Sequence, residues 1–243
     1  MNVLVTAGNT HVPIDRVRYI TNIFSGRTGA AIALEAHHRG HSVTLLTSHP
    51  GALPGPADTQ RWRCIGYRTF NDLLSAMVAG IVSDRPDVVI HSAAVSDYQT
   101  MGVYTVAPGT RFDDRDVTWH GAPPRLVDRT AAAKVKSDEP ELWLRLERTP
   151  KLIDYVRSQW GFRGILVKFK LEVGLAPEQL LELADRSRRQ SGADLMVANT
   201  LEALSTWADI GPIDGAYQRV SRDELAPRLL DAVEKLHGKR HHG

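Results

Sequence analysis

Apolar and polar positions along the first part of the chain follow the pattern of strands that alternate with helices. Residues 3–5 form a short apolar run without helical period, which predicts a buried strand. After Gly29 the apolar positions recur at helical spacing, and this pattern ends at Gly40 behind basic residues. Residues 42–47 form a second apolar run, so the three segments together predict a βαβ unit.

The same two patterns continue to the end of the chain. Further strands are predicted at residues 63–67, 87–95, 142–146, 165–172 and 195–199. Helices are predicted at residues 71–84, from Thr149-Pro150 onward, at 177–190, and from the capping box at Ser221 to about Leu236. This alternation predicts an α/β fold with a Rossmann-like, doubly wound, mostly parallel sheet, whose ligands bind at the carboxyl ends of the strands.

The segment around residues 99–147 is irregular and rich in glycine, proline and charge. An excursion of this length between regular elements is more often functional than a plain connector. We therefore expect a flap or hairpin inserted into the fold. No internal repeat or linker stands out, and we expect residues 1–243 to form a single domain.

Composition narrows the functional classes. Hydrophobic residues make up 42% and charged residues 24%, as in ordinary globular proteins, and a net charge of +2 gives no reason to propose a nucleic-acid partner. No apolar run approaches the roughly 20 residues that span a bilayer, and no signal peptide is evident. Cys64 is the one cysteine, which excludes an internal disulfide and predicts a buried, inert thiol. We expect a cytoplasmic protein without membrane partners.

Candidate chemistry lies at the predicted strand ends. Glycines before the first helix would let backbone N–H groups approach an anion, and Arg18 and Arg27 would add donors suited to phosphate. An ordinary strand–loop–helix connection would show the same pattern. Ala93 and Ala94 offer little bulk to an approaching ligand, and Asp97 could hold a magnesium ion, a hydroxyl or an amine, or cap a turn.

Several well-known signatures are absent. The first strand is not followed by G-x-G-x-x-G, the P-loop pattern does not occur, and no tyrosine has a lysine four residues on. These absences argue against a standard dinucleotide site, a P-loop protein and a short-chain reductase. No set of metal ligands stands out, so the metal ligands are left unassigned.

Four blocks in order along residues 3–199 resemble the phosphopantothenoylcysteine synthetases, also called phosphopantothenate–cysteine ligases. They are the opening G-x-T, I-D-x-V-R-x-I-T-N and S-G-x-x-G; A-A-V-S-D-Y at 93–98; F-K-L-E at 169–172; and L-M-V-A-N at 195–199. In many bacteria this domain is the C-terminal half of a fused flavoprotein. Nothing precedes it here, and we expect the standalone form.

The resemblance implies a role for each matching residue. Those implied to bind the nucleotide are Gly8, Ser25, Gly26, Gly29, Phe169 and Asn199. Those implied to contact phosphopantothenate are Asn22, Ala93, Ala94 and Asp97, while Arg18 would reach into the neighbouring subunit's site in a homodimer. Lys134 would stabilise charge on the reacting phosphate, and Asn22 would hold the acyl-nucleotide. Phe24 and Ser137 depart from the family, in place of a phosphate-binding hydroxyl and a lysine.

The resemblance also implies the reaction. A ligase of this family joins 4′-phosphopantothenate to L-cysteine through an acyl-nucleotide, with magnesium accompanying the triphosphate. The short opening loop favours CTP, which would release CMP and pyrophosphate, whereas the K-F-K-L-E block at 168–172 is closer to members that use ATP. Two alternatives are an NAD(P)-dependent Rossmann-like reductase and a non-catalytic nucleotide-binding protein.

Overall fold

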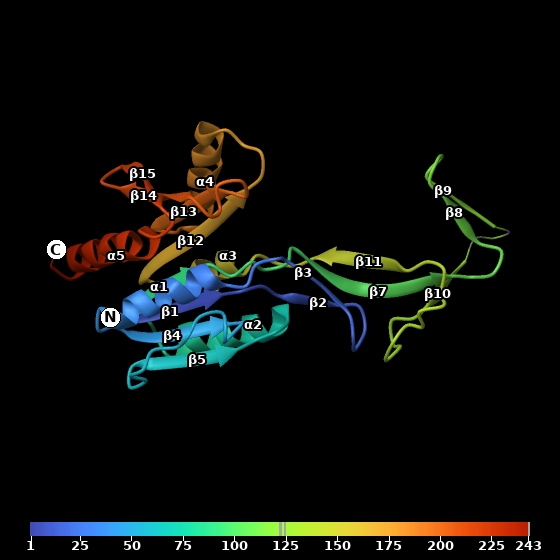
Figure 1. Ribbon diagram of the computed structural model, residues 1–243, viewed down its shortest axis with the longest axis horizontal. Coiled ribbons are helices and arrows are strands. Elements are labelled where there is room, and N and C mark those ends of the chain that lie inside the picture. Colours follow the sequence, from blue (N-terminus) through green and yellow to red (C-terminus); the bar gives the residue numbers. More distant parts are fainter. Residues whose placement is uncertain (122, 124, 243) are drawn as a thin grey trace. The chain divides into compact units, whose positions relative to one another are not determined.

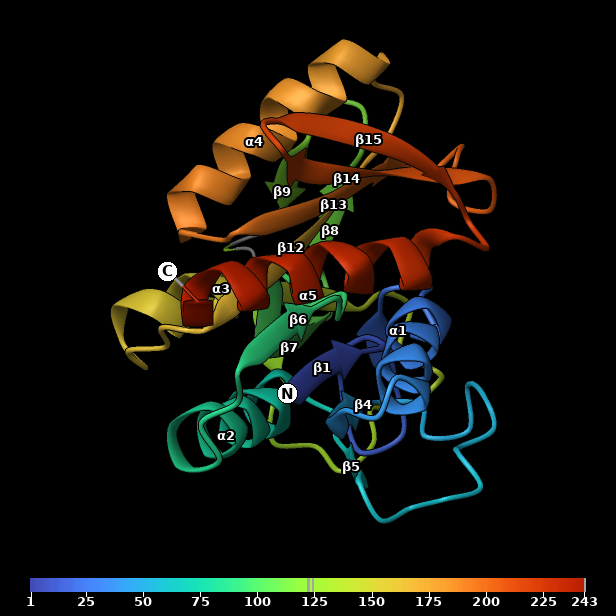
Figure 2. The same ribbon diagram turned by 90° about the vertical axis from the view of Figure 1, so that its left-hand side faces the viewer.

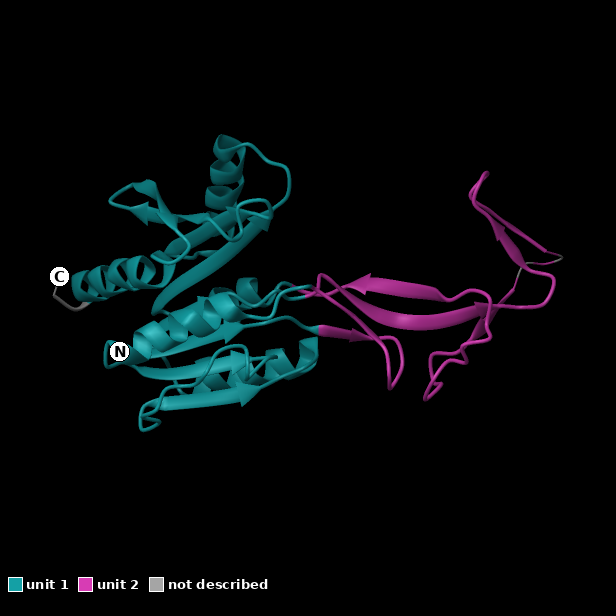
Figure 3. Cartoon of the chain, viewed as in Figure 1, with its two compact units in different colours: residues 1–10, 23–95, 151–243 teal, residues 11–22, 96–150 magenta. Residues whose placement is uncertain are grey.

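The computed structural model describes the backbone of residues 1–121, 123 and 125–242, and the side chains of these residues up to position 240. The chain divides into two compact units (Figure 3). The first contains residues 1–10, 23–95 and 151–243, and the second contains residues 11–22 and 96–150.

An eight-stranded sheet forms the centre of the first unit, in the order β15-β14-β13-β12-β6-β1-β4-β5 (Figure 1). Its strands are β1 (Asn2–Ala7), β4 (Ser42–Thr47), β5 (Trp62–Gly66), β6 (Val88–His91), β12 (Ile165–Glu172), β13 (Leu195–Thr200), β14 (Trp207–Ile213) and β15 (Ala216–Ser221). The six strands from β5 to β13 are parallel, and β14 and β15 add antiparallel strands at one edge. The mostly parallel, Rossmann-like sheet predicted from the sequence is therefore confirmed.

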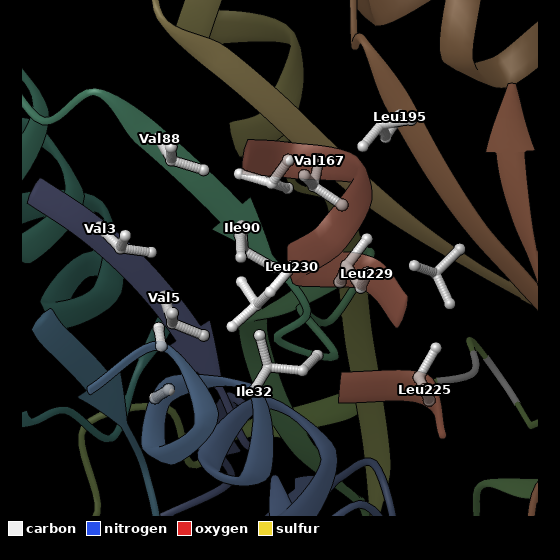
Figure 4. Close-up of a cluster of buried hydrophobic side chains, with 14 of the residues drawn as sticks. Val3, Val5, Ile32, Val88, Ile90, Val167, Leu195, Leu225, Leu229 and Leu230 are labelled. Carbon is white, nitrogen blue, oxygen red and sulfur yellow. The ribbon is translucent and has the colours of Figure 1, made fainter. Parts of the chain in front are cut away.

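Helices cover both faces of this sheet (Figure 2). On one face, α1 (Arg27–His38) and α5 (Leu225–His242) pack against alternate strand residues such as Val5, Ile90 and Val167 (Figure 4). On the other face, α2 (Phe70–Val78) and α3 (Leu152–Ser158) pack against Leu4, Val89 and Leu166. A third helix there, α4 (Pro177–Ser191), covers Met196 and Ala198. Burial on both faces explains why the strands read as continuous apolar runs.

A row of three polar side chains lies on the sheet face covered by α2, α3 and α4, near the carboxyl ends of the strands. Thr6, His91 and Lys168 are register partners on β1, β6 and β12. His91 Nδ1 lies 2.9 Å from Thr6 Oγ1, and Lys168 donates from Nζ to the carbonyl of Ser187 at 3.0 Å. Burial, aided by the charge of Lys168, lowers the pKa of His91 to about 4, so the imidazole is neutral at pH 7.

A three-stranded antiparallel sheet forms the second unit. The strand β7 (Tyr98–Val106) lies between β10 (Leu126–Asp128) and β11 (Trp143–Arg148). Two hairpins complete the unit, β2–β3 (His11–Pro13 and Tyr19–Thr21) and β8–β9 (Arg111–Asp113 and Thr118–His120). The hairpin insertion predicted around residues 99–147 is thus a small sheet of its own, with Phe112, Trp119 and Trp143 packed ring against ring.

The helix predicted at 71–84 is observed as an α-helix to Val78 that continues as a π-helical turn over Ala79–Ser83, where Gly80 packs closely against Leu4. Two other local predictions were wrong. Thr149 does not cap α3, because its hydroxyl donates to the carbonyl of Ser96 at 2.7 Å. Cys64 is exposed rather than buried, because β5 is the edge strand of the sheet.

The antiparallel hairpin β14–β15 was missed by the sequence analysis. Its two strands are joined by Asp214 and Gly215, both with positive φ, and Ile213 pairs with Ala216 across the turn. An Asp-Gly pair between apolar runs is the strongest short-range hairpin signal, and it is present in the sequence. Among the described helices, none is long and apolar enough to cross a membrane.

Candidate functional site

The main pocket opens at the carboxyl ends of the parallel strands in the first unit. The strand order reverses between β1 and β6, because the chain leaves β1 toward β4 and β5 and then returns to the other side of β1. Open α/β sheets bind ligands at such a reversal. The pocket measures about 770 Å³. It is lined by Gly8, Ile23, Phe24, Ser25, Gly26, Arg27, Thr28, Gly29, Ser92, Ala93, Ala94, Phe169, Lys170, Leu171, Asn199, Leu201, Leu204, Ser205 and Arg222.

Close backbone packing shapes the floor of this pocket. Gly8 and Gly26 both have positive φ, and a Cβ at Gly26 would lie 2.4 Å from the backbone nitrogen of Gly8. A Cβ at Gly29 would lie 2.4 Å from Ser92 Oγ and 2.7 Å from the Cβ of Ala7. Glycine is therefore required at these positions because the end of β1 and the start of α1 pack too closely for a side chain. The predicted access for a ligand is a further consequence of the same small residues.

The N-terminus of α1 faces this floor without a cap of its own. Gly26 is the N-cap residue, no side chain caps it, and the first turn contains no acidic residue. The orphan N–H groups and the helix dipole of such a terminus favour an anion.

Side chains around the pocket reinforce its preference for negative charge. Its lining includes three cationic residues, Arg27, Lys170 and Arg222, and no carboxylate. The Arg222 guanidinium donates to Thr28 Oγ1, and its burial lowers its pKa. Lys170 Nζ lies 2.8 Å from a carboxylate oxygen of Glu172 on the same strand. A multiply charged anion would therefore meet cations contributed by α1, β12 and the segment after β15.

The segment after β6 continues alongside the segment after β1. Ser92 donates from Oγ to the carbonyl of Thr6 at 2.6 Å, and the Ala93 N–H donates to Thr6 Oγ1 at 3.3 Å. The Ala94 N–H donates to the carbonyl of Gly8 at 2.8 Å. These bonds fix the backbone of both alanines beside Gly8, so small side chains leave the pocket open there.

Apolar residues line another part of the pocket surface. Phe169 is half-buried, packing on one side against the core beneath α1 and α5 while also lining the pocket. Leu171, Leu201 and Leu204 extend this apolar surface, and the buried Asn199 lies at the end of β13. An aromatic ring beside aliphatic side chains suits a flat heterocycle.

Eight of the predicted site residues thus come together in one pocket. They are Gly8, Ser25, Gly26, Gly29, Ala93, Ala94, Phe169 and Asn199. The other four, Arg18, Asn22, Asp97 and Lys134, belong to the second unit.

Within the second unit these four have distinct surroundings. The Arg18 guanidinium is bonded to Asp15 and to the carbonyl of Val135. Asp97 is exposed, and its backbone carbonyl accepts the N–H of Thr149 at 2.9 Å. Lys134 is exposed in a segment without helix or strand, and Asn22 is half-buried just after β3.

Sequence reasoning missed several residues of the pocket. Arg222, Leu204 and Ser205 follow the last family-like block, and the capping box that contains Arg222 predicts a helix start rather than a ligand site. Phe24 lines the pocket where the family usually has a hydroxyl, so an aromatic ring occupies a place near the α1 terminus.

The pocket does not offer a ligand set for a bare metal ion, because its lining lacks carboxylates, histidines and cysteines. Within the part of the chain that the structure describes, one group has metal-ligand geometry: Asp113, Asp116 and His120 of the β8–β9 hairpin. It belongs to the second unit and is composed of exposed or half-exposed side chains, which commonly gather without a metal.

The fold and the pocket define a Rossmann-like α/β domain with an anion-binding crevice at the reversal of its strand order. Residues 1–106 match the DNA/pantothenate metabolism flavoprotein C-terminal domain family. The matched residues contain the first two of the four sequence blocks, so over this stretch the chain is similar to the family that the blocks resemble.

Sequence similarity to a curated relative extends over nearly the whole chain. The chain is 37% identical over 240 residues to the coenzyme A biosynthesis bifunctional protein CoaBC of Thermococcus kodakarensis, covering 96% of this chain and 51% of that protein. The chain therefore spans about half the length of this curated relative.

Solved structures resemble the fold over nearly the whole chain. The DNA/pantothenate metabolism flavoprotein from Streptococcus pneumoniae is 28% identical with a TM-score of 0.78, covering 98% of this chain and 100% of that chain. A Cab2 mutant in complex with phosphopantothenate-cysteine is 19% identical with a TM-score of 0.67, covering 98% of this chain and 86% of that chain. The second likeness is one of fold alone.

Proposed function

We propose that the chain is a phosphopantothenate–cysteine ligase, which joins 4′-phosphopantothenate to L-cysteine in coenzyme A biosynthesis. The observation that carries this proposal is the convergence of residues from all four family-like blocks on one pocket at the strand-order reversal. The relationship to CoaBC supports it, as does a fold shared with a Cab2 mutant that binds phosphopantothenate-cysteine.

The proposed reaction has two steps. The carboxylate of phosphopantothenate attacks the α-phosphate of a nucleoside triphosphate, which gives an acyl-nucleotide and releases pyrophosphate. The cysteine amine then attacks the acyl carbon, forms the amide bond and displaces the nucleoside monophosphate. In both steps the nucleophile and the leaving group belong to the substrates. The protein therefore contributes mainly by positioning the substrates and by neutralising the phosphate charge.

The first unit would bind the nucleotide. Gly8, Ser25, Gly26 and Gly29 would surround the phosphates at the N-terminus of α1, and Asn199 would contact them from β13. Phe169 would pack against the base at the apolar part of the pocket. Arg27, Lys170 and Arg222 would add positive charge, which a triphosphate requires and a neutral ligand does not.

The remaining assignments rest on the family resemblance. Ala93, Ala94, Asn22 and Asp97 would contact phosphopantothenate, and Asn22 would hold the acyl-nucleotide. Lys134 would stabilise the charge that builds on the reacting phosphate. We propose that both units serve one ligase domain, and that the protein acts as a homodimer in which Arg18 contributes to the neighbouring site.

The nucleotide is proposed to be CTP, on the length of the opening loop, with ATP as the alternative. Cytosine presents an amino donor beside acceptors, which backbone groups can read. Magnesium would enter with the triphosphate, held by phosphate oxygens, since the pocket lining has no carboxylate for it. A cytoplasmic location stays a prediction.

Pyrophosphate release that requires phosphopantothenate would test the proposed reaction. We expect Lys134→Ala to lower kcat for this release about 100-fold or more, with a smaller change in KM, because the lysine would act in the transition state. Lys151→Ala, an exposed lysine outside the pocket lining, serves as the matched control. Pyrophosphate release without phosphopantothenate, or a change in nicotinamide absorbance instead, would contradict the proposed ligase activity.

A comparison of kcat/KM for CTP and for ATP decides which nucleotide the enzyme uses.

A further inference from the structure

The segment that contains Lys134 is bonded on both sides to a tight turn in the same unit. The Arg16 N–H donates to the carbonyl of Ala133 at 3.1 Å. The Val135 N–H donates to Asp15 Oδ2 at 3.1 Å, and the carbonyl of Val135 accepts from Arg18 Nη2 at 2.8 Å. The backbone is therefore fixed immediately before and immediately after the lysine.

Asp15 is the centre of these contacts. Its Oδ1 accepts the N–H groups of Val17 at 2.9 Å and Arg18 at 2.8 Å. Its Oδ2 accepts Arg18 Nε at 3.0 Å, Arg18 Nη2 and the Val135 N–H. The Asp15 side chain has no exposed surface. The Arg18 guanidinium holds the pKa of this carboxyl well below its usual range, so the carboxylate stays ionised.

The Lys134 segment is not held by regular secondary structure, although Arg129 before it forms an ion pair with Glu139 after it at 2.9 Å. No helix or strand lies between β10, which ends at Asp128, and β11, which begins at Trp143, in the part of this stretch that the structure describes. The lysine itself is exposed, whereas Val135 next to it is 3% exposed. A buried residue with both backbone groups bonded to one ion pair is the anchor of an otherwise irregular segment.

We propose that Asp15 is a positioning residue for Lys134, acting through the Arg18 ion pair and the backbone of Val135. This inference rests on the proposed function, in which Lys134 stabilises charge on the reacting phosphate. Asp15 itself does not touch the reacting groups. Asp15 holds the backbone of Val135 directly after the lysine, while the neighbouring Arg16 N–H holds Ala133 directly before it. This restricts the positions from which the ammonium group can act, and catalysis by positioning is sensitive to displacements of about 1 Å.

Asp15→Asn tests this role, because it preserves the size of the side chain while removing its charge and one acceptor. We expect kcat for phosphopantothenate-dependent pyrophosphate release to fall about 10- to 100-fold, with little change in the KM for the triphosphate. The matched control is Asp128→Asn, which removes another low-pKa carboxylate of the same unit that accepts the Thr130 N–H at 2.7 Å. This control should retain wild-type turnover.

A double-mutant cycle separates positioning from scaffolding. If Asp15 acts through the lysine, Asp15→Asn should cause no further loss in the Lys134→Ala background. Hydrogen exchange gives a readout independent of activity: the Val135 amide should lose protection in Asp15→Asn, while the amides of β7 keep theirs. Loss of protection across β7 and β11 as well would overturn the proposal in favour of a general structural role.

The outcomes distinguish this proposal from the proposed function. Near-normal turnover of Lys134→Ala would overturn the role of the lysine itself. Low turnover of Lys134→Ala together with near-normal turnover of Asp15→Asn would overturn the role of Asp15 and leave the ligase intact. Equal losses from Asp15→Asn in the presence and absence of Lys134 would also overturn it, because the two residues would then act independently.

Discussion

The two compact units are stabilised by different kinds of contact. In the first, apolar side chains from six parallel strands and five helices fill both sides of one sheet. In the described part of the second, the buried apolar side chains are Val12, Val103, Ala107 and Val135. That unit relies instead on polar contacts such as the Asp15–Arg18 pair and on the aromatic group of Phe112, Trp119 and Trp143.

This difference bears on how each unit can serve a reaction. Elements with a large buried core open rarely, whereas segments with few buried apolar contacts open at lower free-energy cost. The pocket residues of the first unit are therefore held in place by elements that are part of the large buried core. Lys134 and Asp97, which belong to the second unit, depend on a small number of specific hydrogen bonds.

The largest effect is expected from a cavity in the first unit. Leu166 is fully buried on β12, and Leu166→Ala should lower the free energy of unfolding by about 2–5 kcal/mol. Leu146→Ala in the second unit is the matched control, because Leu146 is 41% exposed and its truncation should cost less than about 0.5 kcal/mol. Denaturant unfolding measures both. Similar losses for the two variants would contradict the contrast between the units.

Acid should also act differently on the two units. His91 binds fewer protons in the folded state, with a pKa of about 4, than in the unfolded state, where it is about 6.5. As the pH falls below 6.5 the unfolded imidazole is protonated first, so the free energy of unfolding should decrease by about 3 kcal/mol between pH 7 and pH 4.

The pKa of Asp15 is also lower in the folded state than in the unfolded state, so its effect on stability has the same sign as that of His91 but falls in a more acidic pH range. Its contribution is complete above about pH 3.9 and is lost only as the pH falls through its folded pKa. The Asp15 carboxylate should thus stay ionised between pH 7 and pH 4, the range in which protonation of His91 lowers the stability.

The free energy of unfolding, measured from pH 7 to pH 4, should change less with pH for His91→Gln than for wild type. The exposed control His38→Gln should show the same pH dependence as wild type. Parallel curves for wild type and His91→Gln would rule out this role for His91.

The smallest effect is expected from a single hydrogen bond between the two ends of the segment 96–150. Thr149→Val removes the hydroxyl that donates to the carbonyl of Ser96 at 2.7 Å, at a cost of about 1 kcal/mol. Hydrogen exchange should show faster exchange at residues 96–100 and unchanged protection in β1 and β6. Faster exchange throughout the first unit would show instead that the two units unfold as one.

The contrast between the units also explains which parts of the fold the sequence could predict. Strands β4 and β12 were predicted at their observed bounds, because each contains a run of buried apolar residues, Leu45-Leu46 in β4 and residues 165–167 in β12. Strand β7, with nine residues, was not predicted, because its Gly102, Thr100 and Thr105 break any two-residue alternation. Its pairing with β10 and β11 is set by long-range contacts rather than by local pattern.

The candidate site divides in the same way. Gly8 and Asn199 were assigned from the family resemblance, and both line the pocket because the topology gathers the ends of the parallel strands at one edge. Arg222 was missed because it enters the pocket from the turn between β15 and α5, and β15 itself was not predicted. Asp15 appeared only as part of a family-like motif, since nothing in the sequence shows that Val135, 120 residues later, is its hydrogen-bond partner.

The contact between Gly8 and Gly26 has a consequence for the kinetics of binding. Ser48 fills the space beside Gly8, and the backbone of Ala7 and Gly8 fills the space beside Gly26. The loop that carries the amides before α1 therefore reaches its final shape when the domain folds. The loss of conformational entropy is incurred at that stage, and an arriving anion finds donors already oriented. Association at this end of the pocket then requires no rearrangement of the loop, and its rate is governed by diffusion and by attraction to the surrounding positive charge.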